Sequence, residues 1–146
     1  IIGYATEIGT ILKQSKELGL TLLFFGPPAT ENPKVLELAG EAAEGILYPY
    51  HFDASSSDPK IVSYQEKYLA KYNHASEGFA VLMYDGTKII ARVLKKCGEN
   101  GPCVKEELYK VKDYEGVTGK TSFDEYGDVM KPIIIKTVKN GRFVLK

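Results

Sequence analysis

Residues 116–128 contain the residue types that most readily suggest chemistry in this chain. Residues 119–121, Gly-Lys-Thr, resemble the end of a phosphate-binding loop. That motif needs a glycine five positions before Gly119, where the chain has Tyr114. It also needs a following helix whose N-terminal amides hold the phosphate, but residues 123–128 carry the Asp and Gly of tight turns. We therefore predict a strand, a turn and a second strand here, and no nucleotide site.

The two cysteines, Cys97 and Cys103, enclose a segment that contains two glycines, an asparagine and a proline. Such a segment favours a tight reversal, which would bring the two Cα atoms within the roughly 7 Å that a disulfide allows. Two free thiols are the alternative. A zinc site needs further ligands, and the two histidines, His51 and His74, are distant in sequence. A disulfide would indicate an oxidising compartment.

The remaining polar residues form no catalytic constellation. We find no nucleophile beside a base, no paired carboxylates and no metal cluster, so we expect no enzyme, no catalytic residue, no metal and no cofactor. The 19 basic residues balance 19 acidic ones, which favours neither nucleic acid nor an anionic membrane as a partner. No apolar run approaches the ~20 residues that span a bilayer.

The first fifty residues alternate between strand and helix patterns. Strands are expected at 1–4, 20–25 and 45–50, and helices at 7–18 and 34–43. Thr6 is expected to cap the first helix, and Asn32 with Pro33 to open the second. This order predicts an α/β fold with a parallel sheet, which binds ligands at the carboxyl ends of its strands.

The rest of the chain begins with helix patterns and ends with strand patterns. Helices are expected from an Asp58 cap and Pro59 to Tyr72, from a Ser76 cap to Leu94 and over 106–114. Strands are expected at 117–123, 133–138 and 143–145. Asn140-Gly141 is a strong hairpin signal. The last strands are expected to return to the first sheet. The wide apolar faces of the middle helices then require another surface to pack against.

Several short motifs, taken in order, carry a resemblance to a known family. They are Gly3-Tyr4-Ala5-Thr6-Glu7, Gly26-Pro27, Ala42-Ala43-Glu44-Gly45, Tyr84-Asp85, Gly116-Val117-Thr118-Gly119, Phe123-Asp124 and Gly127-Asp128. This series resembles the type I periplasmic solute-binding proteins of ABC importers, in their leucine/isoleucine/valine-binding branch. The resemblance covers nearly the whole chain and implies a C-terminal portion of a binding protein.

The resemblance implies a fold in which two α/β lobes close on a small ligand. Residues 1–52 and 115–146 would belong to the second lobe's sheet, with C-terminal strands returning to it. Residues 53–114 would be helices of the first lobe. The partner of these helices would be the missing N-terminal portion of the same protein, and Ile1 is interpreted as a cut, a processing site or the edge of the described chain.

The resemblance also implies ligand contacts at matching positions. Tyr4 would contact the ligand from the second lobe and Phe79 from the first; packing within the fold is the alternative for each. The amino-acid-binding members hold the ligand's ammonium with an acidic residue after Gly-Pro, a position occupied here by Pro28. Either Glu31, three residues further on, substitutes for it, or the ligand lacks an amino group.

By resemblance, the function is extracytoplasmic capture of an amino acid or organic carboxylate and its delivery to an ABC importer permease. The ligand-sensing extracellular domain of a receptor is the alternative. The location would be periplasmic or extracellular, with a membrane anchor carried by the missing N-terminus.

Overall fold

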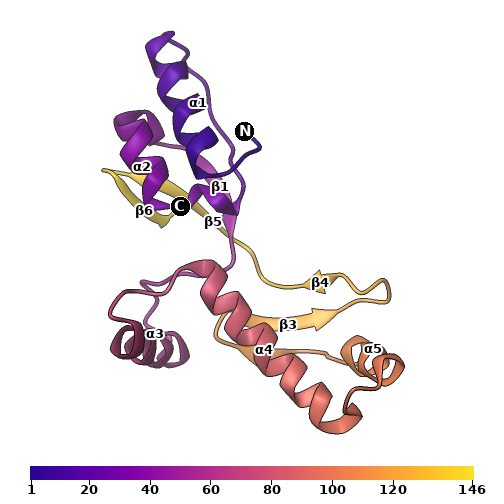
Figure 1. The fold of residues 1–146 in the computed structure, drawn as a ribbon. Helices are drawn as coiled ribbons and strands as arrows, with labels where there is room; N and C mark the ends of the chain where they lie inside the picture. The colour runs from indigo at the N-terminus through magenta and orange to yellow at the C-terminus, as the bar shows by residue number, and fades with distance from the viewer. The chain divides into compact units, whose positions relative to one another are not determined.

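The computed structural model describes all residues, 1–146, in two compact units (Figure 1). Unit 1 comprises Ile1–Tyr50 and Ile133–Lys146, and unit 2 comprises His51–Pro132. The sequence had instead predicted that residues 115–146 share a sheet with residues 1–52. Residues 115–132 lie in unit 2 because the amides of Val117 and Thr118 donate to Asp85 there. The assignment of residues to lobes of the family stays a prediction.

The helices of unit 1 begin at residues with clear local reasons. The elements are α1 (Ala5–Glu17), η1 (Pro28–Thr30), α2 (Pro33–Ala39) and η2 (Gly40–Ala43). Asn32 caps α2 as predicted, since its side chain accepts from the amide of Lys34 at 2.9 Å. The predicted Thr6 cap is wrong. Tyr4 is the N-cap of α1, and its amide donates to the carboxylate of Glu7 at 3.2 Å.

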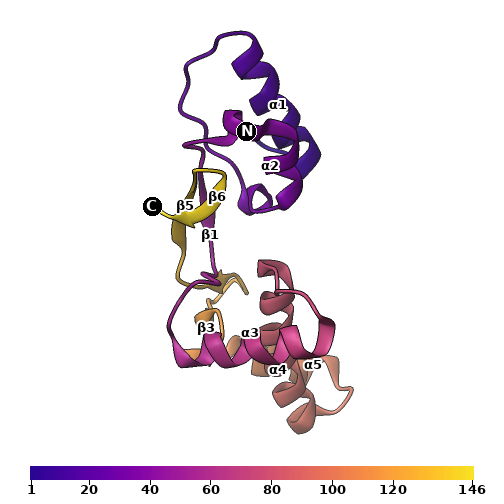
Figure 2. The ribbon, with the colours of Figure 1, turned by 90° about the vertical axis from the view of Figure 1, so that its left-hand side faces the viewer.

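The sheet of unit 1 is antiparallel, with strand order β1-β5-β6. Its strands are β1 (Leu47–Tyr50), β5 (Ile134–Lys139) and β6 (Arg142–Leu145). Helices α1 and α2 lie on one side of this sheet (Figure 2). Between these layers is a core of apolar side chains: Ile8, Leu12, Val35, Ala39, Ala43, Ile46 and Val138. The return of the last two strands to the first sheet is thus confirmed.

The α/β class is confirmed, but the predicted parallel strands are largely absent. Residues 1–4 form no strand, and residues 20–25 contribute one parallel bridge, Phe25 to Leu47. Two hydrogen bonds support that bridge: Gly26 N donates to Leu47 O at 2.8 Å, and Leu47 N donates to Phe24 O at 2.9 Å. The apolar run at 20–25 is therefore extended but has only one short stretch of backbone to pair with.

The helices of unit 2 are α3 (Pro59–Tyr72), α4 (Gly78–Cys97) and α5 (Gly101–Tyr109). Asp58 caps α3 as predicted, accepting from the amide of Lys60. The N-cap of α4 is Glu77 rather than the predicted Ser76, whose buried hydroxyl instead bonds to that of Tyr64. Helix α5 starts earlier than predicted because the side chain of Asn100 caps it.

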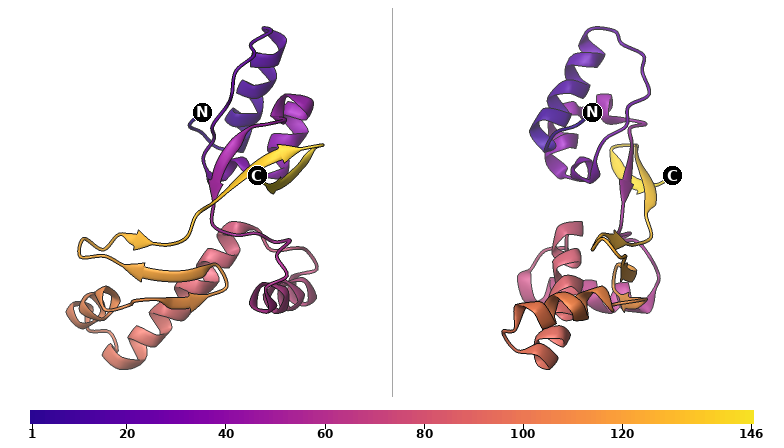
Figure 3. Two further views of the ribbon diagram at one scale, coloured as in Figure 1. Left: turned by 180° about the vertical axis from the view of Figure 1, so that it is seen from behind. Right: turned by 90° about the vertical axis from the view of Figure 1, so that its right-hand side faces the viewer.

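Unit 2 also has a three-stranded antiparallel sheet of its own, which the sequence did not predict as separate. Its strands are β2 (Tyr114–Gly116), β3 (Gly119–Phe123) and β4 (Val129–Met130). Strand β3 runs beside α4 in the views of Figures 1 and 3. Because a strand begins at Gly119, no helix follows the Gly-Lys-Thr sequence, which agrees with the rejection of a nucleotide site.

Candidate functional site

Tyr4 lies at the start of α1 in unit 1, beside the end of the extended run 20–25. The amino group of Ile1 donates to the carbonyl of Phe25 at 2.6 Å, which holds the two segments together. The Tyr4 side chain is 81% exposed and forms no hydrogen bond within the chain. It therefore does not pack at the sheet end, and its ring and hydroxyl face outward.

Gly26 begins the loop that follows Phe25. A Cβ atom built on Gly26 would lie 2.2 Å from Oγ1 of Thr30, so only glycine fits beneath this hydroxyl. Thr30 is completely buried, and its Oγ1 has no hydrogen-bond partner. Pro28 is the first residue of η1, a single turn that ends at Thr30. The first position of such a turn requires no amide hydrogen, so proline fits there.

Glu31 follows this loop and lies in a cluster with two side chains of the sheet. Nζ of Lys136 on β5 lies 2.7 Å from Oε1 and 2.7 Å from Oε2 of Glu31. The hydroxyl of Tyr48 on β1 donates to Oε2 at 2.8 Å. Burial, reinforced by the Glu31 carboxylate, raises the pKa of the Tyr48 hydroxyl far above its usual range.

Lys136 was not among the residues predicted from the sequence. Its position in β5 carried a signal, because alternation places it on the same buried face as Val138. A lysine on the inner face of a strand requires a counter-ion. Glu31 is that counter-ion, although the sequence had suggested it as an anchor for a ligand's ammonium.

Phe79 is in the first turn of α4, within unit 2. Its ring is 60% exposed, so it does not contribute to a core within the described chain. Exposed aromatic rings at a helix start are suitable for covering the apolar part of a ligand. The role of Phe79 as a ligand contact stays a prediction.

Asp85 of α4 connects two of the short motifs that carried the family resemblance. Its carboxylate accepts hydrogen bonds from Val117 N at 2.9 Å, from Thr118 N at 2.8 Å and from Thr118 Oγ1 at 2.5 Å. Gly116 must be glycine, since a Cβ there would lie 2.3 Å from Oδ2 of Asp85. Nζ of Lys131 completes the cluster, and desolvation lowers its pKa despite the nearby Asp85 charge.

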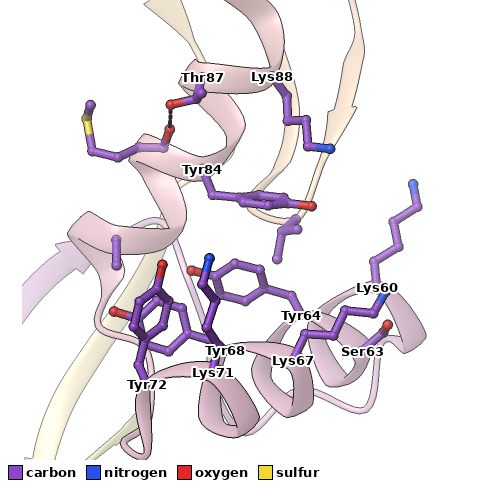
Figure 4. Close-up of a pocket in the computed structure, with 13 residues that line it drawn as sticks. Lys60, Ser63, Tyr64, Lys67, Tyr68, Lys71, Tyr72, Tyr84, Thr87 and Lys88 are labelled. Carbon is purple, nitrogen blue, oxygen red and sulfur yellow. Dashed lines mark hydrogen bonds between the residues drawn. The ribbon is translucent and has the colours of Figure 1, made fainter.

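A pocket of about 830 Å³ opens between α3 and α4 (Figure 4). Tyr64, Tyr68 and Tyr72, spaced four residues apart along α3, line it, and Tyr84 of α4 packs on Tyr64 with ring centroids 5.1 Å apart. Lysines surround the rings: Lys60, Lys67, Lys71 and Lys88. Two of them, Lys71 and Lys88, lie over the rings of Tyr72 and Tyr84.

The predicted disulfide is confirmed, with the Cα atoms of Cys97 and Cys103 5.6 Å apart. It joins the end of α4 to the start of α5. Ring nitrogens of both histidines lie within hydrogen-bonding distance of backbone carbonyls, His51 of Gly78 and His74 of Ala75. No group of three or more His, Cys, Asp or Glu side chains is arranged to hold a metal ion. No helix has both the length and the apolar character required to cross a membrane.

Comparison with known proteins now identifies the family. The sequence model described as "Periplasmic binding protein" matches residues 1–142. The leucine-, isoleucine-, valine-, threonine- and alanine-binding protein of Pseudomonas aeruginosa is 34% identical over 129 residues, covering 87% of this chain and 34% of that protein. The Leu/Ile/Val-binding protein of Escherichia coli is 30% identical over the same length.

Solved structures agree with these sequence matches. The leucine binding protein of Thermotoga maritima superposes with a TM-score of 0.87 at 29% identity, covering 100% of this chain and 42% of that one. A branched-chain amino acid transporter substrate binding protein of Streptococcus pneumoniae, in complex with isoleucine, gives 0.83 at 31% identity, covering 97% and 41%.

The chain spans about a third of the length of the curated relatives it matches, and they are binding proteins rather than enzymes. The expected fold class is confirmed, because the structural neighbours are two-lobed α/β binding proteins. The resemblance inferred from the short motifs is confirmed as well. This chain belongs to the periplasmic binding protein family, in the type I branch that includes the leucine/isoleucine/valine-binding proteins.

Proposed function

We propose that the protein is the substrate-binding component of an ABC importer, which captures a small amino acid or organic carboxylate between two lobes. The match of the family sequence model to residues 1–142 carries this proposal. Relatives with the same fold are named as amino acid binding proteins, and one was solved with isoleucine. Closure of two lobes on a ligand is a two-state hinge motion that a permease can recognise.

The ligand contacts are proposed from position and exposure. Tyr4 of unit 1 and Phe79 of unit 2 are aromatic and largely exposed, and neither side chain belongs to a buried core of the chain. Pro28 lies in the loop after Phe25 that follows the extended run of unit 1, whereas the carboxylate of Glu31 in the same loop is paired with Lys136. The remaining contacts would come from the part of the full-length protein that precedes these residues.

Partners and location follow from the same proposal. The partners are the permease of the importer and the N-terminal portion of the same protein. The Cys97–Cys103 disulfide supports an oxidising, periplasmic or extracellular location. A membrane anchor would belong to the N-terminal portion.

The proposal is tested by calorimetry of the full-length protein against a panel of small ligands. The panel contains leucine, isoleucine, valine and the 2-oxo acid that corresponds to each. We expect at least one to bind with a Kd of about 1 μM or below. Absence of heat from every member, in protein shown by circular dichroism to be folded, would contradict the proposal.

A further inference from the structure

Glu31 already has an ammonium partner within the chain. Both of its carboxylate oxygens lie 2.7 Å from Nζ of Lys136, and Tyr48 donates a further hydrogen bond at 2.8 Å. A carboxylate that receives three short contacts from two side chains has little remaining capacity for a ligand. Glu31 is therefore in use as a structural counter-ion.

The pair is buried, which makes it difficult to separate. The side chains of Lys136 and Glu31 are 4% and 17% exposed. Nζ of Lys136 also lies 5.2 Å from the centroid of the Tyr50 ring. If Glu31 turned toward a ligand's ammonium, Lys136 would remain as a buried charge without its counter-ion, which is strongly unfavourable.

The other carboxylates of unit 1 either have a partner within the chain or lie at the far end of α1 from Tyr4. Unit 1 contains no aspartate and six glutamates. Apart from Glu31, four have partners, and they are Glu7 at the amide of Tyr4, Glu37 at Lys34, Glu41 at Lys16, and Glu44 at the amides of residues 140 and 141. The sixth, Glu17, ends α1, at the opposite end of that helix from Tyr4.

We propose that Lys136 determines the ligand class. Because Lys136 forms an ion pair with Glu31, the Glu31 carboxylate is not free to bind the α-ammonium group of an amino acid. The ligand is then a small organic carboxylate with an apolar tail and no ammonium group, such as a 2-oxo acid. A 2-oxo group carries no charge, so it enters a closed site without requiring a carboxylate, whereas a buried ammonium without one is costly. This inference rests on the proposed function.

A matched ligand pair tests the inference in the full-length protein. L-leucine and 4-methyl-2-oxopentanoate share the same carbon skeleton and differ at the 2-position, where one has an ammonium group and the other a carbonyl. By calorimetry, we expect the 2-oxo acid to bind at least about tenfold more tightly. Tighter binding of leucine would overturn the inference and leave the proposed function standing. If no member of the ligand panel bound, both would fail.

Variants at Lys136 test whether this residue is the cause. Lys136→Met should free Glu31 and shift the affinity ratio toward leucine by about tenfold or more. Lys136→Arg, which keeps a cation beside Glu31, should preserve the wild-type preference. Lys139→Met, in the same strand but exposed, is the matched control and should change nothing.

Thermal unfolding verifies that each variant is folded before its affinities are compared. A folded Lys136→Met protein with an unchanged ligand preference would overturn the role of Lys136. If that variant does not fold, the wild-type comparison of the two ligands still decides the ligand class.

Discussion

Tyr4 is the residue whose exposure is easiest to interpret in functional terms. It is 81% exposed, so its side chain contributes little buried surface to unit 1. In the full-length protein, Tyr4→Ala should therefore weaken ligand binding by about tenfold or more while changing the melting temperature little. Calorimetry and thermal unfolding measure the two effects.

Tyr126 offers a matched control for this prediction. It is 79% exposed, lies in the turn before β4 and is not a predicted ligand contact. Tyr126→Ala should leave the affinity unchanged. Equal affinity of the Tyr4→Ala variant and the wild type would remove Tyr4 from the ligand site.

Tyr48 leads to a prediction about alkaline pH. Burial, with the Glu31 carboxylate beside it, raises the pKa of its hydroxyl above the unfolded value of about 10. The resulting contribution to stability is complete below about pH 10 and is lost as the pH rises further. Near pH 11, Tyr48 should therefore still be un-ionised in the folded wild type and contribute no tyrosinate absorbance. The folded Tyr48→Phe protein should then show the same tyrosinate absorbance as the wild type.

The unfolded state provides the control for the Tyr48 titration. In concentrated urea at the same pH, Tyr48→Phe should lose the absorbance of one of the ten tyrosines. A loss of that size in the folded protein as well would show that Tyr48 ionises without restraint.

At the scale of elements, the sequence predicted what local chemistry determines. The Asn32 and Asp58 caps and the Asn140-Gly141 turn, whose residues have φ of 52° and 67°, all lie where their local signals placed them. The strand predicted at 20–25 did not form fully, because strand formation depends on a partner and only Phe25 has one.

Local signals of this kind could not predict side-chain pairs whose members are far apart in sequence. Lys136 and Glu31 are 105 residues apart in sequence, and Asp85 and Thr118 are 33 apart. The inner-face position of Lys136 indicated a need for a counter-ion but not which one. The ligand-contact role of Tyr4, Phe79 and Pro28 stays a prediction, because no contact within this chain tests it.

The α4–α5 connection is an element whose stability rests on a covalent link. The disulfide between Cys97 and Cys103 closes a short loop, and the chain-entropy account assigns such a loop about 2 kcal/mol. The double variant Cys97→Ser, Cys103→Ser should thus lower the melting temperature by several degrees.

A reducing agent supplies the internal comparison for the disulfide. It should lower the melting temperature of the wild type by a similar amount and leave the double variant unchanged. The melting temperature of the wild type could instead stay unchanged although alkylation shows that both thiols have been reduced. The disulfide would then contribute nothing to stability.

At the scale of the whole molecule, each unit has buried residues of its own. Val35 belongs to the core of unit 1, and Asp85, 3% exposed, anchors β2 and β3 to α4 in unit 2. A chain of two compact units is expected to depart from two-state unfolding. Calorimetry of the 146-residue chain should therefore show two transitions, with a calorimetric enthalpy larger than the van't Hoff value.

Two variants assign the transitions to the units. Val35→Ala creates a cavity in the core of unit 1 and should lower one transition, by an amount that corresponds to about 2 kcal/mol. Asp85→Ala leaves the part-buried amide of Val117 and the buried amide of Thr118 without an acceptor and should lower the other transition by about 2–3 kcal/mol. Asp128→Ala is the control for Asp85, since the Asp128 side chain is exposed and forms no hydrogen bond. If Val35→Ala and Asp85→Ala shifted the same single transition, the two units would unfold as one cooperative body, and the effect of each residue would extend beyond its own unit.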